Sequence, residues 1–123
     1  MHVIDYGHMR DGVLYHGTMS DMDGAPKATW IYEEGGRKVT RDQPIDEERF
    51  RALWNGIAGL DVFRRHMVRG PDQPIDPAGY HVIGIAFQQQ GQHGQCLFLV
   101  PDAEVDPEFV QWLQMLEPPQ GSA

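Results

Sequence analysis

The alternation of apolar and polar positions divides the first third of the chain into short strand-like runs. Apolar residues at 3–6 and 13–16 flank a polar, glycine-bounded loop at 7–12, which is typical of a β-hairpin. Residues 28–32 alternate in the same way. The Gly-Gly pair that follows tolerates the positive φ angles of a tight turn before the run at 37–40. These patterns predict two hairpins.

The most apolar runs lie later in the chain, at Tyr80–Phe87 and Cys96–Val100, and predict two central strands. The polar segment 88–95 between them contains two glycines and predicts a hairpin loop. Residues 60–68 fit neither the helical nor the strand period, so we expect an irregular segment or a short strand there.

The segment after Asp46 has the spacing of an amphipathic helix. Phe50, Leu53, Trp54 and Ile57 recur at i, i+3, i+4 and i+7, which gathers them on one face. The carboxylate of Asp46 can accept hydrogen bonds from the first free N–H groups of this helix. The sequence therefore predicts a helix that begins at this cap.

A second helix is predicted after Asp106, with Pro107 at a position where its missing N–H costs nothing. Apolar residues recur through this helix up to Leu116, and Pro118-Pro119 ends it. We expect the tail, about 118–123, to fray.

These elements predict one α+β domain spanning residues 1–123. We expect an antiparallel sheet of about six strands, built from hairpins and packed against two principal helices. The expected core consists of Trp30, Phe50, Leu53, Trp54, Ile57, Val82, Ile83, Ile85, Phe87, Leu97, Leu99, Trp112 and Leu116. Since Val82 and Ile83 point to opposite faces of one strand, this core implies a sheet covered on both faces.

Composition narrows the class of protein. The chain has 123 residues, 41% of them apolar, which suits a single packed domain. No apolar stretch is long enough to span a bilayer, and the net charge of −8 disfavours binding to nucleic acid. The first residues lack the basic flank and apolar run of a secretory signal, and lone Cys96 excludes an intrachain disulfide. We therefore expect a cytoplasmic protein.

The charge is unevenly distributed. After Arg69 the chain contains seven acidic residues and no Lys or Arg. Such a segment can serve solubility alone, or it can form an anionic surface that steers a cationic protein partner. For the second interpretation, the candidate partner-binding residues are Asp72, Asp76, Asp102, Glu104 and Glu108.

Catalytic and metal-binding motifs are scarce in the sequence. The six histidines form no H-E-x-x-H pattern, and phosphate-binding loops and nucleophile elbows are absent from the sequence. His93 and Cys96 offer two metal ligands without a second pair nearby. One interpretation of Cys96 is a thiol nucleophile with His93 or His81 as its base. The apolar residues around Cys96 favour the other interpretation, a buried structural thiol. We expect no catalytic residue, no metal and no cofactor.

Together these features predict a small, acidic, non-enzymatic protein-binding domain with a basic protein partner. In size, acidity and succession of hairpins and helices the chain looks like bacterial immunity proteins, which neutralise a toxin. No motif carries this likeness, so it is no family assignment, and it implies only an inhibitor or adaptor of a toxin or enzyme. The alternative is a small ligand-binding protein or enzyme, with a pocket between sheet and helices near His81, His93 or Cys96.

Overall fold

Seven strands form one antiparallel sheet in the order β4-β3-β2-β1-β6-β7-β5 in the computed structural model, which describes residues 1–22, 24–68 and 78–116. The elements in chain order are β1 (His2–Arg10), β2 (Val13–Ser20), β3 (Lys27–Glu34), β4 (Arg37–Pro44), α1 (Glu47–Gly59), α2 (Asp61–Arg65), β5 (Met67–Val68), β6 (Tyr80–Gln89), β7 (Gln92–Pro101), the 3-10 turn η1 (Asp102–Glu104) and α3 (Pro107–Leu116).

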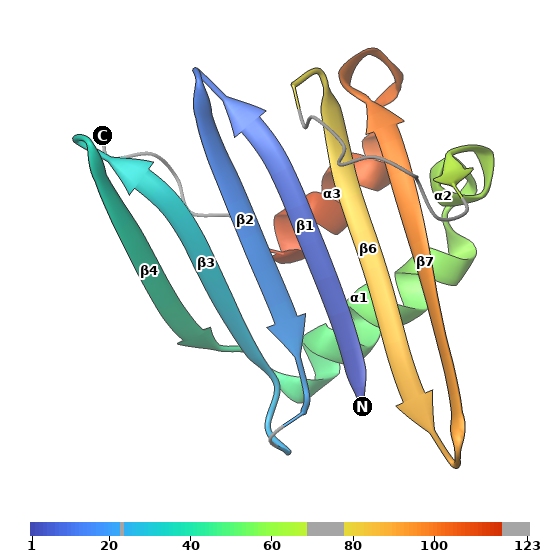
Figure 1. Cartoon of the computed structure of the whole chain (residues 1–123). Coiled ribbons are helices and arrows are strands. Elements are labelled where there is room, and N and C mark those ends of the chain that lie inside the picture. Colours follow the sequence, from blue (N-terminus) through green and yellow to red (C-terminus); the bar gives the residue numbers. More distant parts are fainter. Residues whose placement is uncertain (23, 69–77, 117–123) are drawn as a thin grey trace.

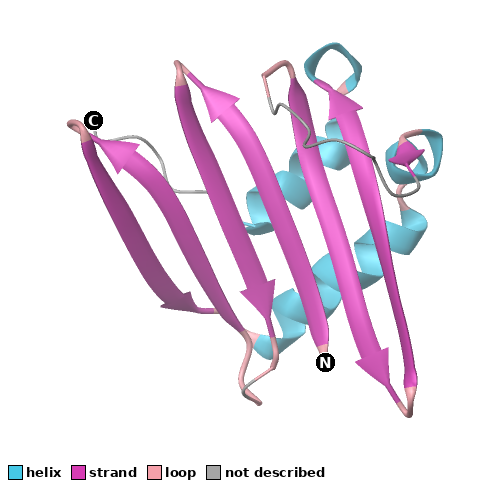
Figure 2. Cartoon of the chain, viewed as in Figure 1, coloured by secondary structure: helices cyan, strands magenta, loops and turns pink. Residues whose placement is uncertain are grey.

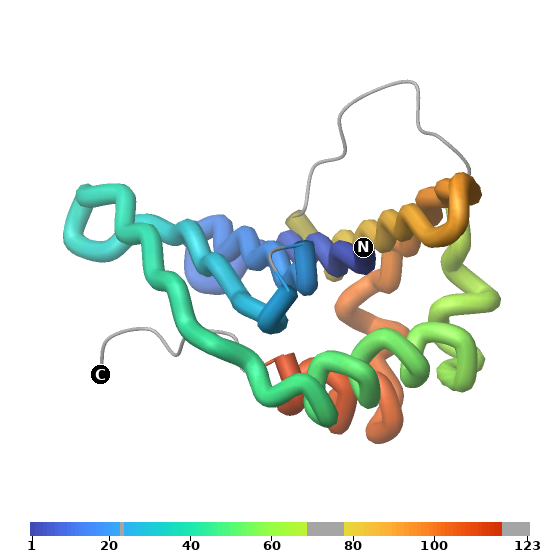
Figure 3. The backbone as a smooth tube through the Cα atoms, turned by 90° about the horizontal axis from the view of Figure 1, so that it is seen from below, coloured from blue at the N-terminus to red at the C-terminus, as the bar shows by residue number. Residues whose placement is uncertain are grey.

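The helices lie together on one face of this sheet (Figure 1). Figure 2 separates the two layers by colour, and the view from below in Figure 3 places α1 and α3 side by side under the strands. The predicted α+β class with two principal helices is confirmed, with one strand more than the six expected.

The hairpins are confirmed, but two of their loops are shorter than predicted. β1 and β2 pair up to Arg10 and Val13, so the segment 7–10 belongs to the strand. Asp11 and Gly12 form the turn, with φ angles of 51° and 79° that suit a two-residue hairpin connection. β6 and β7 likewise pair up to Gln89 and Gln92, across a turn at 90–91. Polar residues near the turns hid these strand ends from the sequence pattern.

Both predicted helix caps are present. A carboxylate oxygen of Asp46 accepts a hydrogen bond from the backbone N–H of Glu48 at 2.8 Å. The carboxylate of Asp106 accepts one from the N–H of Phe109 at 2.7 Å. The region 60–68 was predicted incompletely, because the short helix α2 precedes the two-residue strand β5.

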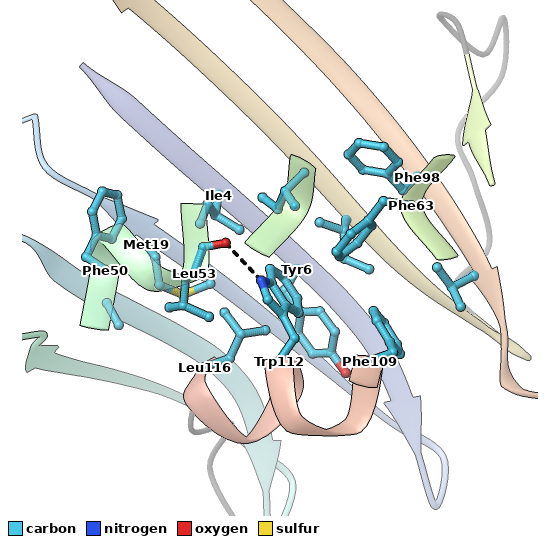
Figure 4. Close-up of a cluster of buried hydrophobic side chains, with 14 of the residues drawn as sticks. Ile4, Tyr6, Met19, Phe50, Leu53, Phe63, Phe98, Phe109, Trp112 and Leu116 are labelled. Atoms are coloured by element: carbon cyan, nitrogen blue, oxygen red, sulfur yellow. Dashed lines mark hydrogen bonds between the residues drawn. The ribbon is translucent and has the colours of Figure 1, made fainter. Parts of the chain in front are cut away.

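The core lies between the helices and one face of the sheet (Figure 4). Trp112 of α3 is 1% exposed and its indole N–H donates to the carbonyl oxygen of Leu53 in α1 at 2.9 Å. The buried core residues absent from the prediction are Ile4, Tyr6, Tyr15, Met19, Ala28, Tyr32, Ile45, Val62, Phe63, Phe98, Val100 and Phe109. Most of them lie in strands or in a helix that the sequence did predict, whereas Met19 lies in a part of β2 that it did not reveal.

The expectation of a sheet covered on both faces is wrong for the described residues. Val82 alternates with buried Ile83, so it lies on the face opposite the helices, as do its neighbours Leu97 and Leu99. All three are half-buried. Trp54, Ile85 and Phe87 were also expected in the core and are half-buried as well. Among the described helices, none is long and apolar enough to cross a membrane.

Candidate histidine–carboxylate site and acidic end

Three elements distant in sequence meet at one end of the sheet. β1 pairs with β6 so that Tyr6 lies opposite Ile83 and Gly7 opposite Val82. The continuation of this register brings His8 beside His81. η1 follows directly on β7 at the same end, near the start of β6, since the N–H of Asp102 donates to the carbonyl oxygen of Gly79 at 3.0 Å (Figure 1).

The side chains at this junction form a compact cluster. The imidazole rings of His8 and His81 stack with centroids 3.8 Å apart and an interplanar angle of 5°. Nε2 of His8 is hydrogen-bonded to Oδ1 of Asp102 at 3.0 Å, and Nε2 of His81 lies 3.3 Å from the same oxygen. On the inner side, Oη of Tyr6 is hydrogen-bonded to Nδ1 of His81 at 2.8 Å.

Burial determines the charge state of the inner part of the cluster. Burial raises the pKa of Tyr6 to about 12, although the positive charge of Arg10 opposes the rise. Burial also lowers the pKa of His81 to about 4, and the proximity of His8 adds to the effect, against the attraction of Asp102. Tyr6 is therefore a neutral phenol and His81 a neutral imidazole at pH 7.

The lowered pKa of His81 predicts a loss of stability in mild acid. His81 binds its proton near pH 6.5 in the unfolded chain and only near pH 4 in the folded chain. The contribution of neutral, buried His81 to the free energy of unfolding is therefore complete above pH 6.5, and it falls as the pH drops from 6.5 to 4. We expect a loss on the order of 1–3 kcal/mol in metal-free buffer, measured by urea denaturation. His81→Gln should flatten the pH dependence, whereas the exposed His93→Gln should leave it unchanged. An equally steep dependence in His81→Gln would contradict this assignment.

The predicted partner-binding residues are only partly brought together. Asp102 and Glu104 lie in η1 and Glu108 in the first turn of α3, all three exposed. Asp72 and Asp76 lie outside the described residues. We call the set Asp102, Glu104 and Glu108 the acidic end.

Two carboxylates of the acidic end contact histidines of the same chain. Oε2 of Glu104 lies 2.9 Å from Nε2 of His66, and Asp102 contacts His8 and His81. Over the described ranges, no ion pair joins Asp102, Glu104 or Glu108 to Lys or Arg.

An exposed aromatic residue lies at the same end of the sheet as the acidic end. Tyr80 is 42% exposed, and it pairs with Pro101, the residue before Asp102. Because Tyr80 alternates with buried His81, its ring leaves β6 on the face opposite the helices, whereas Asp102 contacts His81 on the helix side.

A separate hollow lies between the helices and the sheet. It has a volume of about 330 Å³ and an apolar lining apart from Arg64. The lining residues are Trp54, Ile57, Ala58, Phe63, Arg64, Met67, Ile85, Phe87 and Phe98. A pocket between the sheet and the helices was the alternative prediction, and this hollow lies in that position. His81, His93 and Cys96 were expected near the pocket, but none of them lines it.

The cluster of His81, His93 and Cys96 considered from the sequence does not form. In the β6–β7 ladder, His81 pairs with Val100, Cys96 with Ile85 and His93 with Gln88, so the three are spread along the hairpin. Cys96 is half-buried, rather than buried as expected, and packs against the core.

The sequence did not single out Tyr6 and His8 as site residues. One usable signal was present, because Tyr6 and His8 are two apart and share a face once residues 7–10 are recognised as strand. The pairing of β1 with β6, more than seventy residues away, had no local signal.

Comparison of the chain with models of known protein families, with curated proteins and with solved structures finds no match.

Proposed function

We propose that this domain is a non-enzymatic binding module that recognises a basic protein partner through the acidic end. The observation that carries the proposal is the grouping of Asp102, Glu104 and Glu108 on η1 and the start of α3, at the end of the sheet where exposed Tyr80 begins β6. The absence of Lys and Arg from the sequence after Arg69 leaves the segment carrying these carboxylates without cations of its own.

The charge of this surface supports fast and selective association. Carboxylates of one sign attract a cationic partner over a distance and repel anionic competitors. Among the described residues, Asp102 and Glu104 have histidine partners and no ion pair with Lys or Arg, although Arg10 lies close enough to the cluster to influence the pKa of Tyr6 and His81. The acidic end therefore supplies steering rather than a fixed ion-pair network.

Tyr80 supplies the second component of an interface. Tyrosine combines a large apolar ring with a polar hydroxyl and is enriched among residues that dominate binding energy. Tyr80 is exposed next to Pro101, at the end of the sheet where η1 begins, so a partner that extends around this end to the outer face of β6 can contact the ring as well as the carboxylates.

Within this function, an immunity-type inhibitor or an adaptor of a toxin or enzyme fits the small size and acidity of the chain. The proposal places the chain in the cytoplasm, which agrees with a single cysteine left free. An inhibitor of this type would abolish the activity of its partner on binding, whereas an adaptor would not.

Charge reversal tests the proposal. Glu104→Lys with Glu108→Lys should slow association with the partner captured by the wild-type chain by about tenfold or more at low salt. Its rate should also depend less on ionic strength than the wild-type rate. Asp102 is left unchanged because its contacts with His8 and His81 hold the cluster together. Surface plasmon resonance at several salt concentrations measures both effects.

The matched control carries the same change in charge elsewhere. Glu33→Lys with Glu34→Lys alters two exposed carboxylates at the β3–β4 turn. This variant should associate within about twofold of wild type. Equal slowing by both double variants would indicate a general charge effect, and unchanged rates in the first would contradict the proposal.

The hollow beside Trp54 favours a second candidate function, the binding of a small apolar ligand. Its volume lies at the lower limit for ligand pockets, and Arg64 is its one charged lining residue. A ligand there would change the fluorescence of Trp54, whereas a partner at the acidic end would not contact this side chain.

A further inference from the structure

We propose that His8, His81 and Asp102 bind a divalent first-row transition-metal ion. Two imidazole nitrogens and one carboxylate oxygen from three different elements lie within 4.8 Å of one another, in the single group of this kind among the described residues. This donor set suits zinc, iron(II), cobalt(II) or nickel(II), whereas Mg²⁺ and Ca²⁺ prefer oxygen ligands alone. The inference goes beyond the proposed function.

The separations between the donor atoms match those around one ion. Ligands bound at about 2.0–2.1 Å are about 3.3 Å apart in tetrahedral geometry and about 2.9 Å apart at right angles in octahedral geometry. The carboxylate oxygen of Asp102 lies 3.0 Å from Nε2 of His8 and 3.3 Å from Nε2 of His81. The carboxylate oxygen therefore already lies at ligand spacing from each of the two nitrogens, and all three donors lie within 4.8 Å of one another.

One ring has to turn before both nitrogens can address the same ion. An imidazole binds metal in its own plane, and the stacked rings have parallel planes. His8 is the ring that can turn, because its Nδ1 is buried without a hydrogen-bond partner in the structure. Rotation about the Cβ–Cγ bond costs His8 its stacking on His81 and its contact with Asp102, and coordination to the same ion replaces the second of these.

His81 is held in place from behind by Tyr6. Ligand histidines commonly hydrogen-bond a neighbouring group through the second ring nitrogen, which fixes the ring and its tautomer. Nδ1 of His81 is 2.8 Å from Oη of Tyr6, which leaves Nε2 directed towards Asp102. A phenol can accept as well as donate, so Tyr6 can accept a hydrogen bond from Nδ1–H when Nε2 binds the metal.

The site is open on one side. Asp102 is 50% exposed and the side chain of His8 13% exposed, so solvent reaches the outer edge of the cluster. Three protein ligands with an open edge leave at least one coordination position for water or for an external ligand. The other described histidine–carboxylate pairs, His66 with Glu104 and His2 with Asp21, provide two donors each.

Titration of chelator-treated protein with zinc chloride tests the proposal. Isothermal calorimetry should show one zinc ion per chain, undiminished by excess Mg²⁺. Asp102→Asn and His8→Gln should each weaken the affinity by at least tenfold, because each removes a ligand. Tyr6→Phe should weaken it by about tenfold while leaving the stoichiometry unchanged.

Matched controls separate this site from adventitious zinc binding. His66→Gln and His93→Gln remove histidines outside the cluster and should keep the affinity within about twofold of wild type. Circular dichroism in chelator verifies that each variant folds, and half-exposed Asp102 makes Asp102→Asn the variant of choice if His8→Gln does not fold.

Two results would overturn the metal site. One is the absence of stoichiometric zinc binding, and the other is an equal loss in Asp102→Asn and His66→Gln. The Glu104→Lys, Glu108→Lys chain should bind zinc within about twofold of wild type. The metal site and the protein interface can therefore fail independently.

Discussion

Replacement of Trp112 with Ala is expected to lower the free energy of unfolding by about 3–5 kcal/mol. The side chain is 1% exposed, packs edge-to-face on Phe63 with centroids 5.1 Å apart and stacks with Phe109. Its removal leaves a cavity between α1, α3 and the sheet, and it also leaves the carbonyl of Leu53 without its indole donor. Urea denaturation measures the change.

Two further variants resolve the contributions to this loss. Trp112→Phe keeps much of the apolar contact and removes the hydrogen bond to Leu53, so we expect an intermediate loss. Trp54→Ala removes an indole that is only half-buried and should cost less than Trp112→Ala. If Trp112→Ala cost no more than Trp54→Ala, the packing of α3 described here would be wrong.

Gly17→Ala is expected to lower the free energy of unfolding by about 1–3 kcal/mol or more, because the added methyl group overpacks the core. A Cβ at Gly17 would lie 2.6 Å from the ring of Trp30, which is completely buried. Gly7→Ala is the matched control on the neighbouring strand, since its Cβ would meet only Val82 at 4.0 Å. Thermal denaturation of the two variants should separate them clearly, and equal stabilities would contradict the position of Trp30.

The local features of the fold were predictable from sequence, because their causes are local. The caps at Asp46 and Asp106 and the turn at the Gly-Gly pair each depend on residues within one or two turns of the chain. The apolar spacing of the first helix likewise identified Leu53 and Ile57 as core residues.

The cluster of His8, His81 and Asp102 depends on causes that are not local. It forms because β1, the first strand, pairs with β6, far along the chain, and because η1 follows at the same end of the sheet. The alternation of side chains then decides which residues meet, so an error in one strand boundary removes His8 from consideration. The sequence assigned residues 7–10 to a loop and therefore missed this site.

The acidic end could be predicted from the sequence only in part. The lack of Lys and Arg after Arg69 could be read directly and pointed to Asp102, Glu104 and Glu108. Their contacts with histidines, and the exposure of Tyr80 at the same end of the sheet, required the tertiary structure. A charge count finds such a surface, but it does not find an aromatic anchor near it.

Hydrogen–deuterium exchange of the free chain and of its complex with the captured protein tests the central claim most directly. We expect slowed exchange at the end of β7, through η1 and into the first turn of α3, together with the start of β6 at Tyr80. We expect no change in the β3–β4 hairpin. Protection confined to that hairpin, or to the helices around Trp54, would contradict an interface at the acidic end.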